Sequence, residues 1–149
     1  MICVMNNAYS ILIAERNRHV RDFLKREMSA AGYQLQLAKD GREVLRWIRS
    51  GEIFDLIILD PDLPDAGEIK ILKTLQDQMP ALPVVIHTFL SDYTQLPADI
   101  RPLALVIKNG DSIDNLKKMV AQLLAASHQK RSENLISRSP KVNEHGNEP

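Results

Sequence analysis

The sequence predicts an α/β protein in which helices cover both faces of a parallel β-sheet, giving a three-layer sandwich. Short apolar runs alternate with longer segments whose apolar residues recur at helical spacing, and unbroken apolar runs are typical of strands buried on both faces. Four of these runs end on or beside a polar residue: Glu15, Asp60, Thr88 and Lys108. Because the carboxyl ends of parallel strands meet at one edge of a sheet, we expect one charged site there, suited to phosphoryl chemistry.

Composition narrows the class of protein. The chain has 149 residues, enough for one ordinary domain and a tail. Its 19 basic and 19 acidic residues balance, so we expect no direct nucleic-acid or membrane partner. The lone Cys3 cannot form an intrachain disulfide. No apolar stretch reaches the roughly 18 residues that span a bilayer, and no signal peptide is evident, so we expect a cytoplasmic protein.

The first predicted unit is a strand over residues 10–15 followed by a helix. Asn17 is a suitable N-cap, and Gly32 is a suitable left-handed stop. The apolar residues between them lie at helical spacing: Val20, Phe23, Leu24, Met28 and Ala31.

The second predicted unit is a weaker strand over residues 33–38 and another helix. Apolar and polar residues alternate in this strand, which suits the edge of a sheet. Asp40 with Glu43 three residues later predicts a capped helix start, and Gly51 predicts its end.

The third predicted strand, over residues 54–60, is the most apolar and should lie at the centre of the sheet. A proline-rich loop over 60–65 follows it. The next helix should direct these residues inward: Ile69, Leu72, Leu75 and Met79.

Two further strands are predicted over residues 83–88 and 103–108. The segment between them should contain the fourth crossover helix, but it includes Pro97 and Pro102. Proline removes a helical hydrogen bond and clashes with the preceding turn. We therefore expect this fourth helix to be short or irregular.

The last helix should start at Asp111 or Ser112, and the sequence beyond residue 126 is polar. We therefore expect a flexible N-terminus over 1–7, one domain over 8–126 and a disordered polar tail over 127–149. Five strand-helix units with right-handed crossovers favour the flavodoxin-like strand order 2-1-3-4-5, which puts the ligand-binding switch point between the first and third strands.

With these landmarks in order over residues 8–126, the chain resembles the receiver domain of two-component response regulators, the CheY-like family. The matching residues are the acid after the first strand, Glu15, the aspartate after the third, Asp60, the apolar-proline pair Leu63-Pro64, the hydroxyl of Thr88 and the amine of Lys108.

The resemblance implies that Asp60 accepts a phosphoryl group from a histidine kinase or phosphotransfer protein. Glu15, Asp60 and the backbone carbonyl of Asp62 would hold Mg²⁺. Lys108 would pair with phosphoryl oxygens. Thr88 would swing its hydroxyl onto the same oxygens, and this movement would be the conformational response to phosphorylation. Such a module is no enzyme, and it would act on an unknown protein target as a monomer or weak dimer.

Arg16 stands where the family usually has a second acid. Unit charges about 4 Å apart interact by roughly 4 kcal/mol at an effective dielectric near 20, so Arg16 would oppose a metal strongly. Either its side chain turns into solvent and magnesium binds weakly, or its guanidinium takes the metal's place and pairs with Asp60. Other departures from the family pattern are Phe89, Leu105, Asn109 and Gly67-Glu68.

Three functional hypotheses follow. The chain is a single-domain response regulator phosphorylated on Asp60, or a pseudo-receiver that works as a phosphorylation-independent interaction module, or a flavodoxin-like enzyme or cofactor binder. Against the third, the loop over 15–18 lacks the glycines or hydroxyls that cradle a phosphate. The histidines are scattered, and His87 is predicted to face away from Thr88 in its strand.

Overall fold

A computed structural model of the chain describes residues 8–65, 70–89, 104–108 and 112–138. The described strands are β1 (Ser10–Ala14), β2 (Gln34–Ala38), β3 (Leu56–Leu59), β4 (Val84–Thr88) and β5 (Ala104–Ile107). The described helices are α1 (Arg18–Ala30), α2 (Gly41–Arg49), α4 (Ile71–Gln78) and α5 (Ser112–Arg138). The predictions for residues 1–7, Gly67-Glu68, Pro97, Pro102 and Asn109 concern positions outside the described residues.

The described strands form one parallel sheet in the order β2-β1-β3-β4-β5. The predicted α/β class is confirmed, and this order agrees with the one expected from the sequence. The most apolar strand, β3, lies between β1 and β4. The helix expected between β4 and β5 falls outside the described residues, so its irregularity stays a prediction.

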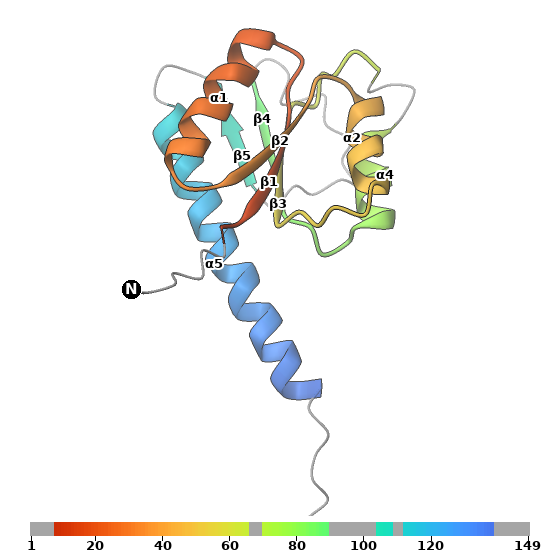
Figure 1. Cartoon of the computed structure of the whole chain (residues 1–149), viewed down its shortest axis with the longest axis vertical. Helices are drawn as coiled ribbons and strands as arrows, with labels where there is room; N and C mark the ends of the chain where they lie inside the picture. The colour runs from red at the N-terminus through yellow and green to blue at the C-terminus, as the bar shows by residue number, and fades with distance from the viewer. Residues whose placement is uncertain (1–7, 66–69, 90–103, 109–111, 139–149) are drawn as a thin grey trace, which may run out of the picture.

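Two apolar clusters fill the space on the two faces of the sheet. Along β1, Ile11 and Ile13 pack with residues of α1 and α5, whereas Leu12 and Ala14 pack with residues of α2 and α4. This alternation follows from the two-residue period of side chains in a strand. Figure 1 shows α1 and α5 on one side of the sheet and α2 and α4 on the other, which is the predicted three-layer arrangement.

The predicted helix starts are confirmed. The Asn17 side chain accepts hydrogen bonds from the backbone of His19 at 2.9 Å and of Val20 at 3.1 Å. Asp40 accepts one from the backbone N–H of Glu43 at 2.9 Å. Gly32 follows α1 with a φ of 97°, a left-handed conformation that favours glycine. These contacts fix where α1 and α2 begin relative to the sheet edge that carries the site.

The structure differs from the sequence prediction at the last helix. We expected disorder from residue 127, but α5 continues to Arg138 and extends beyond the sheet (Figure 1). No glycine or proline occurs from residue 111 to 139, and alanine, leucine, glutamine, lysine and arginine recur there. Good helix formers can propagate a helix already nucleated by packing. None of the described helices is long and apolar enough to cross a membrane.

Candidate functional site

The sheet register brings the four predicted polar residues to one edge. Ala14 pairs with Leu59, so the next residues, Glu15 and Asp60, follow neighbouring strands. Thr88 pairs with Ile107, and Lys108 comes next.

The site formed by these residues is largely withdrawn from solvent. Glu15, Asp60 and Thr88 are each 1% exposed, and the Lys108 side chain is 8% exposed. Such burial of polar groups requires that they satisfy one another.

Lys108 is the cation that links the two buried acids. Its Nζ donates to Glu15 Oε1 at 3.0 Å and lies 3.7 Å from Asp60 Oδ2. Its backbone N–H donates to the carbonyl of Thr88 at 2.7 Å, which holds the strand end beside β4. Lys108 therefore forms a buried salt bridge with Glu15 and lies close to Asp60.

The electrostatic balance around Glu15 is unfavourable to two ionised acids. Burial and the neighbouring charge of Asp60 raise the pKa of Glu15, while the hydrogen bond and charge of Lys108 act against this rise. Two carboxylates close together in a site of low dielectric disfavour each other's ionised form. The ionised forms of these two acids therefore depend on nearby cations.

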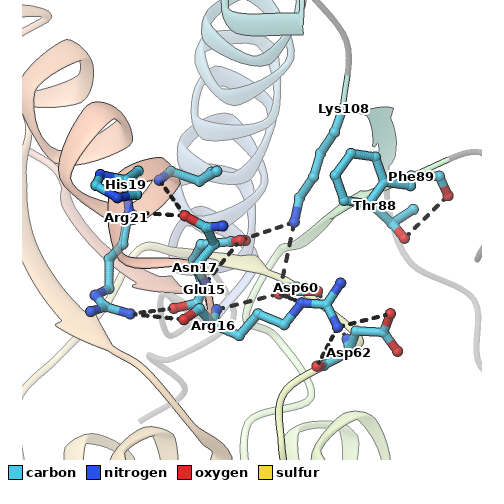
Figure 2. A network of polar contacts seen from close by, with 11 residues as sticks. Glu15, Arg16, Asn17, His19, Arg21, Asp60, Asp62, Thr88, Phe89 and Lys108 are labelled. Atoms are coloured by element: carbon cyan, nitrogen blue, oxygen red, sulfur yellow. Dashed lines mark hydrogen bonds and ion pairs between the residues drawn. The ribbon is translucent and has the colours of Figure 1, made fainter.

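Arg16 supplies the second cation, from the turn between β1 and α1. Its Nε lies 3.5 Å from Asp60 Oδ2. Its Nη1 donates to the backbone carbonyl of Asp62 at 3.4 Å and also lies 3.4 Å from Asp62 Oδ2. Figure 2 shows the guanidinium between the two aspartates. The guanidinium thus pairs with Asp60, as in the second of the two arrangements expected for Arg16.

Both oxygens of the Asp60 carboxylate have hydrogen-bond donors. Oδ1 accepts from the backbone N–H of Asp62 at 2.9 Å, and Oδ2 accepts from the backbone N–H of Arg16 at 3.3 Å. The backbone N–H of Asp60 itself donates to the carbonyl of Ala14 at 2.8 Å. The carboxylate is held by the loops that follow both β1 and β3.

Thr88 and Phe89 form the β4 side of the site. The Thr88 hydroxyl donates to the carbonyl of Phe89 at 3.4 Å, and the Phe89 ring centre lies 5.0 Å from Lys108 Nζ. This is a cation-π distance. Phe89 therefore lies against the amine of Lys108 while its side chain remains 46% exposed.

Three contributors were not identified from the sequence. Arg21 Nη1 donates to the carbonyls of Glu15 at 2.8 Å and Arg16 at 3.4 Å. Asp65 accepts from the first backbone N–H groups of α2, Gly41 at 2.7 Å and Arg42 at 3.1 Å. An arginine five residues after a strand carries no specific signal, and an aspartate in a proline-rich loop is usually read as a turn former.

His87 is the third contributor. It is 3% exposed, and neither imidazole nitrogen has a hydrogen-bond partner within the described part of the chain. Burial, together with the charge of Lys108, lowers its pKa to about 4. The sequence predicted a strand residue that faces away from Thr88, but it did not show that the imidazole is buried without a partner in the described residues.

The magnesium ion that the resemblance implies would need oxygen ligands that are already in contact with a cation of the protein. Two of its expected ligands, the Asp60 carboxylate and the Asp62 carbonyl, are the groups that the Arg16 guanidinium contacts. A divalent cation there would lie against a permanent positive charge. In this arrangement the residues do not fit the ion.

Comparisons with known proteins agree with this fold. The family model for the response regulator receiver domain matches residues 11–102. The transcriptional regulator NtrC of Bradyrhizobium sp. is 28% identical over 92% of this chain and 31% of its own length. The regulatory protein ZraR of Escherichia coli K12 is 33% identical over 65% of this chain and 22% of its own length. The chain thus spans no more than a third of either relative.

Solved structures show the same likeness. TrrA from Thermotoga maritima, determined in complex with Mg(2+)-BeF, is 26% identical, with a TM-score of 0.69 over 77% of this chain and 98% of its own. CheY4 of Vibrio cholerae is 21% identical, with a TM-score of 0.68 over 78% of this chain and 99% of its own. The chain belongs to the response regulator receiver domains of two-component systems, which are signalling modules and not enzymes.

Proposed function

We propose that this receiver domain signals through protein-protein contacts in a form that needs no phosphoryl group on Asp60. The observation that carries this proposal is that both oxygens of the Asp60 carboxylate are engaged, one by Asp62 and the other by Arg16. A carboxylate that attacks phosphorus needs a free lone pair aimed at the donor. The burial of Asp60 and these contacts oppose the approach of a phosphoryl donor.

The charge balance supports the same proposal. Phosphoryl transfer depends mainly on positioning and on cations that neutralise the charge of the group being transferred. Here Lys108 already binds Glu15, and Arg16 already binds Asp60 and Asp62. Both cations are therefore committed to the resting acids rather than to an incoming phosphoryl group.

A second candidate function is phosphoryl acceptance on Asp60, with a histidine kinase or phosphotransfer protein as the donor. The assembly of Glu15, Asp60, Thr88 and Lys108 at one edge favours it. Lys108 would then turn from Glu15 to the phosphoryl oxygens, and Thr88 would donate its hydroxyl to them.

The two candidates share a setting. Both imply the cellular setting of the family. The protein would lie in the cytoplasm, receive its signal from a kinase or phosphotransfer protein, and pass it to a protein target. Balanced charge argues against direct contact with nucleic acid or a membrane.

Intact-mass spectrometry after incubation with acetyl phosphate, with and without Mg²⁺, separates the candidates. We expect no phosphoryl adduct on the wild type. An adduct on the wild type that disappears in Asp60→Asn would contradict the proposal and establish the second candidate. The Asp60→Asn variant is a close control because it keeps the side-chain volume and removes the nucleophilic charge.

A further inference from the structure

We propose that Arg16 is the resident cation of this site: its guanidinium takes the place of a divalent ion by bridging Asp60 to Asp62, and so excludes Mg²⁺. This inference deepens the proposed function and rests on it, because it states how the site is kept closed. It concerns Arg16, Arg21 and the loop over 60–65.

The first step is geometric. One guanidinium reaches three acceptors: Nε lies 3.5 Å from Asp60 Oδ2, and Nη1 lies 3.4 Å from both the carbonyl and the Oδ2 of Asp62. The backbone N–H of the same residue donates to Asp60 Oδ2 at 3.3 Å. A planar fork of fixed donors can hold a carboxylate and a carbonyl together, as a point-like ammonium group cannot.

The second step is electrostatic. The site gathers the carboxylates of Glu15, Asp60 and Asp62, and its cations are Lys108 and Arg16. Without Arg16, one lysine would face three acids. The carboxylates of Asp60 and Asp62 would then lose the cation that lies between them. A hard divalent cation is the ligand that such a set of oxygen atoms would accept.

The third step concerns how Arg16 is held. Arg21 reaches back from α1 and donates to the carbonyls of Glu15 and Arg16 themselves, at 2.8 and 3.4 Å. Asn17 caps the same helix and donates its backbone N–H to Glu15 Oε1 at 3.4 Å. The backbone of the turn between β1 and α1 is therefore tied at several points, which holds the backbone of Arg16 beside Asp60 (Figure 2).

The last step concerns the loop that Arg16 contacts. Its first residues, Asp60 and Asp62, bind Arg16, and its Asp65 binds the amino end of α2 through Gly41 and Arg42. The loop is thus anchored at both ends by protein groups. These contacts give the loop a defined shape, which a phosphorylation-independent partner could recognise.

The test is a titration of Mg²⁺ into the isotope-labelled full chain, followed by amide NMR. For the wild type, we expect no saturable shift of the Arg16 and Asp62 amides. For Arg16→Asp, we expect saturable shifts of the residue 16 and Asp62 amides, and Asp60→Asn in that background should abolish them. The matched control is Arg18→Asp. It makes the same change of charge two residues further along the chain. Its parent side chain is 82% exposed and pairs only with Asp22 among the ion pairs seen in the described residues.

Two results would overturn the inference. Saturable binding of Mg²⁺ at Asp62 in the wild type would show that Arg16 does not exclude the ion. No binding in a folded Arg16→Asp protein would show that something other than Arg16 does. Arg16→Asn is the second variant, should the aspartate prevent folding, and it should bind Mg²⁺ more weakly than Arg16→Asp but measurably. An acetyl phosphate adduct on a wild type that binds no Mg²⁺ would defeat the proposed function while leaving this inference standing.

Discussion

Lys108 shows how one side chain can affect the protonation of a neighbouring acid. It is the cation within 3.0 Å of the buried Glu15 and 3.7 Å of the buried Asp60. The pKa of Glu15 is already raised by burial and by Asp60, and Lys108 moderates that rise. A buried ion pair adds little net stability, but removing one member leaves an uncompensated charge.

We therefore expect Lys108→Met to destabilise the fold by about 3 to 5 kcal/mol at neutral pH. The loss should shrink at acidic pH, because protonation of Glu15 removes the unpaired charge. Chemical denaturation of the wild type and the variant at both pH values measures it.

The matched control is Lys117→Met. In the wild type, Lys117 pairs with Glu27 at 3.7 Å near the surface, where the two side chains are 35% and 28% exposed. That change should cost about 1 kcal/mol or less. Equal losses in the two variants would show that burial of the Lys108 cluster is not what matters.

At the scale of elements, the contact between the loop after β3 and the start of α2 links the site to the helix layer. Asp65 accepts from two backbone N–H groups of α2, which have no partner within the helix at its first turn. A Cβ on Gly41 would lie 2.9 Å from both Asp65 Oδ1 and Ile71 Cδ1. Gly41 is thus needed for the close approach of three elements.

We expect Gly41→Ala to destabilise the protein by about 1 to 3 kcal/mol because the neighbours must shift. Helix propensity alone predicts the opposite sign, a gain of about 1 kcal/mol. Thermal or denaturant unfolding of the variant decides between these two effects. Asp65→Ala by itself removes two hydrogen bonds to the start of α2, so the test is a double-mutant cycle. The cost of Gly41→Ala should be smaller in the Asp65→Ala background than in the wild type, and an equal cost in both backgrounds would rule out this account.

At the scale of the whole molecule, burial of His87 costs free energy that the rest of the fold must offset. Its imidazole is buried among the packed layers without a hydrogen-bond partner in the described residues. Its pKa falls from 6.5 to about 4, so it is neutral in the folded chain at neutral pH. Below pH 6.5 the unfolded chain binds a proton that the folded chain does not.

The free energy of unfolding should therefore fall as the pH drops from about 6.5 towards 4, by up to roughly 3 kcal/mol from this residue. The raised pKa of Glu15 has the opposite sign, since it favours the folded chain at lower pH. Comparing His87→Leu with the wild type isolates the histidine. Denaturant unfolding across this pH range should give a flatter profile for His87→Leu, while His19→Gln, at an exposed position of α1, should keep the wild-type slope.

The outline of the fold was predictable because its signals are local. The apolar runs that became β1, β3 and β4, and the caps Asn17 and Asp40, depend on residues close in the chain. The length of α5 was not predictable in the same way. Its polar end looked like a tail by composition, whereas helix propensity and the packed start of the helix extend it to Arg138.

The polar groups at the strand ends were predictable from the sequence, because strand ends in a parallel sheet share one edge and four of these strands end on or beside a recognisable polar residue. The pairing of these groups was not, because it depends on how the folded chain brings them together. Lys108 lies on Glu15 and Arg16 bridges Asp60 to Asp62, contacts between residues far apart in the chain. The direction of a long side chain such as arginine depends on which charges surround it in space, and a linear sequence does not specify that arrangement.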